Sequence, residues 1–461
     1  MNLILLGIYW PVALFMAFLQ YKISFSVKNI VLENTLPSNA VKAPEVLKIL
    51  KNFLKKMLLS AIFFGLALSS ILFIQYDSVV MGIFFLAIFG NVTALFILNI
   101  KAIEEMHELK IEKGWFTDEH NVLTNTQATK IKNRKAFPVW WFIFPLVLFI
   151  GLVIFQTRQN APNAMIFSTA LIYVLFYSLS IWMYYLVKKF PVKAVTKDTD
   201  TNIKINDVQK FFYCRLILSM LLFGLVFGFA MTFFGDGGEK ANLLAFVLII
   251  AVSLGFILYT TVLVFGFRKE TNQLLAYANQ IFYENEDQFW KYGLYINKND
   301  PRIFVPSRMS MNIGVNLGHK TGQGLAIGIV VLTAAILGFL SVTLGYNDFA
   351  QQPFQLNISQ ENQTVQVKNF LSQRTIPIAD IQAVNLVSTN KLDGAARVSG
   401  IGTQQYRTGN FRLENRQLYL LIFNRVNQAV RIETREKDIY INDRTPEKTE
   451  IMYREIQNAA E

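Results

Sequence analysis

The sequence predicts a membrane α-helical bundle of eight transmembrane helices, followed by a small β-barrel or sandwich with a terminal helix. Charged residues make up only 16% of the 461 residues, whereas soluble proteins of this size carry about a quarter. Hydrophobic residues make up 53%, and the mean hydropathy is +0.34. The apolar residues gather in long runs, and polar alternation replaces these runs only after Pro353. This composition argues against an ordinary soluble enzyme.

Eight apolar runs have the length and composition of membrane-spanning helices. About 20 apolar residues are needed to cross a hydrocarbon core of roughly 30 Å. None of the eight runs contains Asp, Glu, Lys, Arg or His. The predicted spans, which make up a transmembrane domain over residues 1–345, are residues 2–20, 57–75, 79–100, 136–156, 164–187, 216–234, 241–267 and 323–345.

Basic residues are distributed unevenly between the loops. Four loops (21–56, 101–135, 188–215 and 268–322) hold seven Lys and Arg each, and the alternate loops hold at most one. The positive-inside rule therefore places these four loops in the cytoplasm. The sequence thus predicts a multi-pass protein of the cell membrane in which both termini are extracytoplasmic.

The formal net charge of +12 follows the loops of the bundle and does not indicate nucleic-acid binding. From Tyr346 onward, 14 Lys and Arg face 13 Asp and Glu, so the tail is almost neutral. The predicted partners are membrane lipids and either a peptide toxin or another membrane protein, with no nucleic acid. Residues 44–56 carry an apolar face among lysines, which indicates an interfacial helix at anionic headgroups or, alternatively, a docking helix.

Residues with catalytic or metal-binding chemistry are scattered along the chain. Cys214 is the single cysteine, which excludes an intramolecular disulfide and a Cys-based zinc site. The three histidines share no metal-ligand spacing, and the sequence contains no nucleophile elbow, P-loop or pair of catalytic carboxylates. We therefore expect no enzymatic activity, no cofactor and no metal.

Residues 288–320 predict a small β-rich cytoplasmic domain. Asn297 to Pro301 has the composition of a turn, and both flanks alternate as short strands. The stretch resembles a short domain of Gram-positive multi-span proteins related to the Sdp-type peptide-toxin immunity family. The matching positions, which this resemblance implies to be structural, are Trp290, Gly293, Tyr295, Asn297, Asp300, Pro301, Arg302, Phe304, Val305, Pro306, Arg308, Asn316 and Gly318.

The chain departs from that family in one loop. Sdp-type immunity proteins carry a Pro-x-x-His-x-Asn-x-x-Gly motif after a transmembrane span, and the loop after the fourth predicted span here has none. The resemblance therefore covers the architecture and leaves immunity as a hypothesis.

Residues 350–461 predict an extracytoplasmic domain of six or seven antiparallel strands and a final helix. Alternating apolar residues such as Leu418, Leu420 and Ile422 indicate half-buried strands. Thr445, Pro446 and Glu447 are typical of a helix start, as cap, first residue and acidic first turn.

This layout resembles the bacterial pleckstrin-homology (PH) domains over about residues 355–460. An Arg-x-x-Gly-x-Gly motif followed by Tyr-x-x-Gly-x-Phe carries the resemblance. Its glycines permit a positive φ in a tight connection between strands. The motif implies structural roles for Gly400, Gly402, Gly409 and Phe411, and we consider Arg397, Tyr406 and Arg407 as partner-binding residues.

Two function classes remain open. The first is a non-enzymatic membrane protein that recognises a peptide or protein partner at the cell surface, in bacteriocin or toxin immunity or in envelope stress sensing. A peptide would add to an exposed edge of the β domain. The second is a transporter or an accessory subunit of a membrane transport complex, and substrate uptake by reconstituted protein would favour it. The absence of ionisable residues from the spans argues against an ion-coupled carrier.

Overall fold

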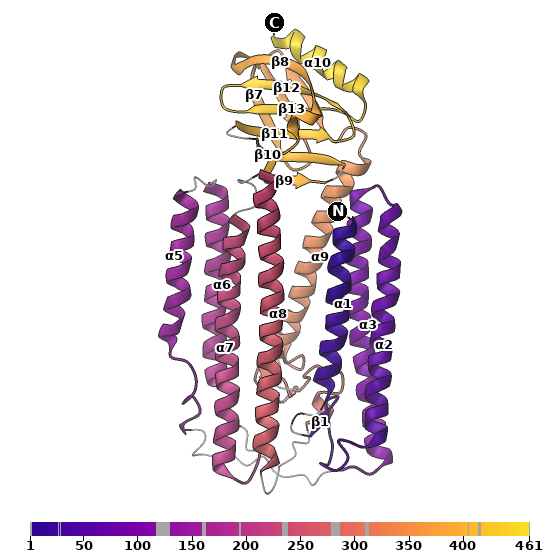
Figure 1. Ribbon diagram of the computed structural model, residues 1–461, viewed down its shortest axis with the longest axis vertical. Coiled ribbons are helices and arrows are strands. Elements are labelled where there is room, and N and C mark those ends of the chain that lie inside the picture. The colour runs from indigo at the N-terminus through magenta and orange to yellow at the C-terminus, as the bar shows by residue number, and fades with distance from the viewer. Residues whose placement is uncertain are drawn as a thin grey trace.

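The structure, a computed structural model, is a bundle of long helices with a β-sheet domain at one end (Figure 1). The first helix begins at the end of the bundle that carries the β-sheet domain (Figure 1). The structure describes residues 2–25, 27, 29–116, 130–158, 163–192, 195–232, 238–277, 286–308, 313–403, 405–413 and 416–460.

Eight helices in these ranges are long and apolar enough to cross a membrane, as the sequence predicts. This is compatible with a multi-pass membrane protein. The helices are α1 (Asn2–Ser24), α2 (Pro44–Leu68), α3 (Asp77–Glu112), α5 (Ile143–Arg158), α6 (Asn163–Lys189), α7 (Thr199–Thr232), α8 (Gly238–Ala276) and α9 (Lys320–Phe349).

The eight helices form two groups of four. In the first group, α2 packs on α1 and α3, and α3 also packs on α9. In the second group, α7 packs on α5, α6 and α8. Figure 1 shows the two groups next to each other, with α8 and α9 nearest the middle. A hydrogen bond links the apolar parts of α2 and α3, because Ser60 Oγ donates to Asn91 Oδ1 at 2.9 Å.

Residues 44–56 do not form a separate interfacial helix. They are the first half of α2, with Pro44 in its first turn. Val46, Leu50 and Phe53 are buried in a core that includes Leu36 and Met106. The apolar face of this segment therefore packs on protein.

Two small hairpins lie at the end of the bundle opposite the β-sheet domain (Figure 1). The first pairs β1 (Ile30–Val31) with β2 (Asn34–Thr35), and the second pairs β3 (Phe304–Pro306) with β4 (Ile313–Val315). The sequence analysis predicted short strands on both sides of the 297–301 turn, and it is wrong about the side before the turn. Both strands of the second hairpin follow the turn, and the residues before it form the short helix η3 (Asp287–Phe289) and further turns.

The C-terminal domain contains more strands than expected. Its described residues form a three-stranded sheet, β5-β6-β7, and a six-stranded sheet in the order β8-β12-β13-β11-β10-β9, in which β11 and β13 are parallel. The strands are β5 (Gln355–Ser359), β6 (Thr364–Lys368), β7 (Gln373–Pro377), β8 (Ile381–Ser388), β9 (Ala396–Gly402), β10 (Tyr406–Leu413), β11 (Arg416–Phe423), β12 (Gln428–Thr434) and β13 (Asp438–Ile441).

Residues of both sheets share one apolar core. Val367 of β6, Leu421 of β11 and Ile432 of β12 are completely buried in it. The final helix, α10 (Pro446–Ala460), begins at the predicted proline and contributes the buried Ile456. Because α10 packs on β5, β8 and β12, it closes the domain as predicted.

Candidate functional site

A buried ion-pair cluster joins four distant parts of the chain at the end of the bundle that carries the hairpins. Its centre is the carboxylate of Asp287 in η3, which is only 7% exposed. Lys110 Nζ of α3 lies 2.8 Å from Asp287 Oδ2, and Arg308 Nη2 lies 2.9 Å from Oδ1. Thr35 of β2 donates to the same carboxylate from its hydroxyl at 2.8 Å and from its backbone nitrogen at 3.0 Å. Asp287 is therefore fully surrounded by donors.

The charges around Asp287 outweigh the cost of its burial. Burial alone would raise the pKa of this carboxyl, but Arg308, Lys110 and the Thr35 amide hold the pKa below its ordinary value. Breaking a buried ion pair by removal of one partner leaves an uncompensated charge in a low dielectric. The cluster is therefore a fixed contact between the first hairpin, α3 and the 286–308 segment.

Glu33 lies at the edge of this cluster in a strained turn. Leu32 and Glu33 connect β1 to β2 with φ values of +46° and +56°, which non-glycine residues rarely adopt. Glu33 Oε2 is buried without a hydrogen-bond partner, although Arg308 Nη1 donates to the Glu33 carbonyl at 2.7 Å. Burial raises the pKa of Glu33 to about 7, with Arg308 opposing and Asp287 reinforcing the rise. Glu33 is thus the acid of this region that titrates near neutral pH.

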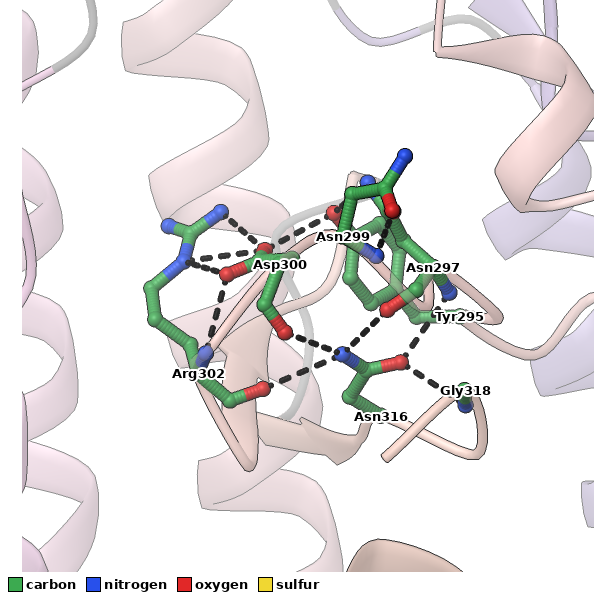
Figure 2. A network of polar contacts seen from close by, with 7 residues as sticks. All are labelled: Tyr295, Asn297, Asn299, Asp300, Arg302, Asn316 and Gly318. Carbon is green, nitrogen blue, oxygen red and sulfur yellow. Dashed lines mark hydrogen bonds and ion pairs between the residues drawn. The ribbon is translucent and has the colours of Figure 1, made fainter. Parts of the chain in front are cut away.

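The predicted turn at 297–301 is held by a network centred on Asn316 (Figure 2). Asn316 Oδ1 accepts from the backbone nitrogens of Asn297 at 3.0 Å and Gly318 at 2.9 Å. Its Nδ2 donates to the carbonyls of Asn297 at 2.9 Å, Asp300 at 3.1 Å and Arg302 at 3.2 Å. Asn316 is completely buried. One amide therefore satisfies five backbone groups.

Asp300 and Arg302 form the second half of this network (Figure 2). Arg302 Nη2 lies 2.6 Å from Asp300 Oδ2, and the Tyr295 hydroxyl donates to the same oxygen at 2.9 Å. Burial would raise the pKa of Asp300, but the hydrogen bonds from Arg302 and Tyr295 lower it to about 2. The carboxylate is ionised and saturated with donors, so it serves the turn and offers no free base.

The 286–318 segment contacts both helix groups. Gly293 has φ +68°, and a Cβ there would lie 2.8 Å from Asn99 Nδ2 of α3 in the first group. The Phe304 ring of β3 meets Trp182 of α6 in the second group, with ring centroids 5.0 Å apart. In addition, Arg268 of α8 donates to the carbonyl of Phe25 after α1. These contacts link the groups at this end.

The remaining family-motif residues also have structural positions. Trp290, Tyr295 and Val305 are buried together, and the ring centroids of Trp290 and Tyr295 lie 5.1 Å apart. Pro306 ends β3, and Pro301 follows Asp300 in the turn. A Cβ at Gly318 would lie 2.4 Å from the Asn297 carbonyl carbon, so this position requires glycine. The structure thus brings the predicted residues of this stretch into one folded unit.

The glycine motif of the C-terminal domain is a close approach between two strands. Gly400 of β9 lies opposite Gly409 of β10, with φ values of +122° and +113°. A Cβ at Gly400 would lie 2.1 Å from the Thr408 oxygen. The positive φ values agree with the sequence analysis, but the glycines lie within paired strands next to a register shift, not in a connecting turn. Gly402 has space for a Cβ, and Phe411 is buried.

The three predicted partner-binding residues occupy different environments. Tyr406 is completely buried where β10 faces the bundle, so it does not lie on the surface. Arg407 donates to Asn424 Oδ1 and to the Leu392 carbonyl, both at 2.8 Å. Arg397 is exposed on the edge strand β9. Of the three, Arg397 is therefore placed best for contact with a partner.

Sequence reasoning missed the residues that pair across the longest distances. Asp287, Lys110 and Thr35 carry no motif, and they meet only because the fold brings η3, α3 and β2 together. Asp77 and Asp348, which lie near each other although they are distant in sequence, were missed for the same reason. Each lies close to the end of an apolar run, and an acid in such a position can be searched for in a sequence. Across the described ranges, no group of three or more His, Cys, Asp or Glu forms a metal site.

Comparison with known proteins identifies the C-terminal domain. The family described as Bacterial PH domain matches residues 356–460, in agreement with the sequence analysis. No curated protein and no solved structure matches the chain. The resemblance of residues 288–320 to the Sdp-type immunity family gains no support from these comparisons and stays a hypothesis.

Proposed function

We propose that this protein is a non-enzymatic, multi-pass membrane protein whose PH domain recognises a peptide or protein partner at the cell surface. The observation that carries the proposal is the edge strand β9. It is the last strand of the six-stranded sheet, and Arg397, Ser399 and Gly400 on it are exposed. An extended peptide gains main-chain hydrogen bonds when it adds to such an edge.

The position of β9 favours a partner that reaches the membrane surface. The residues after β9 contact the helix bundle, because Gln405 Nε2 donates to the Gln75 carbonyl at 2.9 Å. Gln75 lies two residues before the start of α3. A segment that pairs with β9 would therefore lie next to the ends of the spans, where membrane-active peptides act.

The topology of the proposal follows from the basic loops. The four loops with seven Lys and Arg each lie in the cytoplasm, and the PH domain lies outside with both termini. External protease should remove the 350–461 domain from cells without a wall while residues 268–322 stay intact. Cleavage of 268–322 with protection of the PH domain would invert the topology.

Within this class we propose immunity to a bacteriocin or toxin, or envelope stress sensing, in a Gram-positive bacterium. A deletion strain is challenged with a panel of membrane-active peptides and bacteriocins. It is complemented by the full-length protein, by a chain that ends at Gly345, and by Arg397→Glu with Lys448→Glu on the exposed side of α10 as the matched control.

Recognition through β9 would be supported if the deletion strain is selectively sensitive and the full-length chain and Lys448→Glu restore resistance. The chain that ends at Gly345 and Arg397→Glu should then fail to restore it. Rescue by the chain that ends at Gly345 would contradict it. The alternative, a transporter or accessory subunit of a transport complex, predicts no change across the panel and substrate-dependent uptake by proteoliposomes.

A further inference from the structure

The turn between β6 and β7 exposes two large apolar side chains of the PH domain. Phe370 is 45% exposed and Leu371 is 49% exposed. Within the described part of the domain, the only other large apolar side chain with comparable exposure is Ile451 of α10, at 56%. No charged residue lies between Lys368 and Arg374. Single exposed apolar residues are ordinary, whereas an adjacent pair on an uncharged turn indicates a contact surface.

Hydrogen bonds around Asn369 form this turn without the two apolar side chains. Asn369 is buried, and its Oδ1 accepts from the backbone nitrogens of Leu371 at 3.1 Å and Ser372 at 2.8 Å. The Asn369 nitrogen donates to the Ser372 carbonyl at 2.8 Å. An asparagine that bonds to the backbone two residues further on is ordinary turn chemistry. The turn therefore does not need apolar residues at positions 370 and 371 for its own geometry.

The turn lies beside the end of α9, the helix that connects the bundle to the PH domain (Figure 1). The ring of Phe370 lies against that of Tyr346 of α9, with centroids 5.1 Å apart. About one helical turn further along α9, Phe349 is 59% exposed. Its ring lies 4.9 Å from that of Tyr76, which directly precedes α3. Four aromatic side chains therefore form a row from the PH domain to the ends of α9 and α3.

The length of α9 places this row at a membrane boundary. Residues from Leu325 to Leu344 include no charged side chain. About 20 residues of helix cover roughly 30 Å, the thickness of the hydrocarbon core. Tyr346 and Phe349 follow this stretch directly, at the level of the headgroups, where aromatic residues are enriched in membrane proteins. Because Phe370 contacts Tyr346, the turn lies at the same level.

The chemistry of the turn suits the boundary between headgroups and acyl chains. Residues 369–373 carry no charge, so their entry into this layer would bury two apolar side chains without burying an ion. The Ser372 hydroxyl donates to Asn369 Oδ1 at 2.9 Å, so these two polar side chains bond to each other. Apolar side chains of interfacial segments enter this layer to a depth of about 5–10 Å.

We infer that Phe370 and Leu371 enter the lipid surface around the bundle and hold the PH domain against it. The turn adds a contact with lipid to the contacts that the domain makes with α3 and α9. The lipid surface is that of the leaflet at this end of the bundle, and the contact requires no particular headgroup. This role of the turn rests on the membrane-spanning bundle of the proposed function and is independent of the partner of β9.

The test uses the full-length protein in phosphatidylcholine vesicles, with an environment-sensitive fluorophore on one cysteine. Cys214, which is buried, is replaced by alanine in every variant. Leu371→Cys probes the turn, Ile451→Cys is the matched control on α10, and Ile336→Cys reports on the middle of α9; these three positions are 49%, 56% and 53% exposed. Quenching is compared between lipids with a nitroxide near the headgroup and lipids with a nitroxide deep in the acyl chain.

A second background keeps the test valid if Cys214→Ala fails to fold. The three cysteines are then introduced into the wild-type chain, because the buried Cys214 thiol is inert relative to an exposed one. The labelled wild type measures the remaining signal of Cys214. Phe370→Asp combined with Leu371→Cys shows whether the native side chains, and not the fluorophore, bring the turn to the lipid.

We expect the nitroxide near the headgroup to lower the fluorescence at position 371 by about twofold or more. The label on α10 should keep its fluorescence, because α10 lies at the end of the molecule away from the bundle (Figure 1). The label at position 336 should be quenched most by the deep nitroxide. Phe370→Asp should abolish the quenching at position 371, because a charge opposes entry into the apolar layer.

Two results would overturn the role of the turn alone. One is equal quenching at positions 371 and 451 while position 336 is quenched by the deep nitroxide. The other is quenching at position 371 that Phe370→Asp leaves unchanged, which would assign it to the fluorophore. A label at position 336 that escapes both nitroxides would instead contradict the membrane-spanning bundle, and the proposed function would fail with it.

Discussion

The two ends of the bundle surround their buried carboxylates with different kinds of groups. At the end with the hairpins, Asp287 lies within 3 Å of Lys110 and Arg308 and accepts from Thr35. At the end with the PH domain, Asp77 and Asp348 repel each other, and neutral donors hold them: Thr403 and the Gln405 backbone at Asp77, and the Ser78 nitrogen at Asp348. A charge is retained in a protein interior only with a compensating partner. The chain supplies cationic side chains as partners at the first end and neutral hydrogen-bond donors at the second.

The largest effect is expected at the end of the bundle where Asp287 is paired with Lys110 and Arg308. Asp287→Asn leaves Lys110 and Arg308 buried without a counter-charge, which should lower the free energy of unfolding by about 3–5 kcal/mol. Denaturant titration of the full-length protein in detergent measures this loss. Asp380→Asn on the surface should change it by less than about 0.5 kcal/mol. A similar, small effect of both variants would mean that the cluster contributes little.

The next effect concerns the turn that supports the same end. Asn316→Ala removes five hydrogen bonds to backbone groups and should lower the free energy of unfolding by about 3 kcal/mol in the same titration. Asn299→Ala is the control, because the exposed Asn299 enters the network through its backbone nitrogen. Equal costs for both variants would remove Asn316 from the centre of the network.

A smaller effect depends on pH. The pKa of Glu33 rises from 4.5 to about 7 on folding. A raised folded pKa contributes stability at low pH that is lost as the pH rises from the unfolded to the folded value. The wild type should therefore lose on the order of 2 kcal/mol between about pH 5 and 7.5 relative to Glu33→Gln. Parallel stability curves for the two proteins over this range would disprove the assignment.

The smallest effect on stability is expected on the exposed face of the PH domain. Arg397→Glu changes an exposed edge residue and should alter the free energy of unfolding by no more than about 0.5 kcal/mol. The same variant is expected to lose function in the complementation assay. If the variant unfolds readily, its loss of function would be explained by poor folding instead of lost recognition.

The sequence was sufficient for the helices and for the strands with simple alternation. Long apolar runs indicate helices that are apolar on every side, and period-two patterns indicate strands with one buried face. β8 and β10 escaped this reading for physical reasons. α10 covers part of β8, so the half-buried residues of β8 do not alternate with exposed ones. The register shift between Asn410 and Phe411 moves the inward positions of β10 by one residue.

The candidate sites were predictable only where their residues lie close in sequence. Asn297, Asp300 and Arg302 stand within one turn, and turn chemistry found them. Thr35 and Asp287 are 252 positions apart, so their pairing depends on the packing of the whole bundle. Tyr406 was considered as a partner-binding residue, but it is completely buried beside the ends of α3 and α9.

One measurement tests the comparison between the two ends of the bundle most directly. The thermal midpoints of the wild type, Asp287→Asn and Asp77→Asn are determined for the full-length protein in detergent. We predict that Asp287→Asn lowers the midpoint because it leaves two buried cations without a counter-charge, whereas Asp77→Asn does not lower it because it removes one of two like charges. An equal loss of stability in both variants would contradict the account.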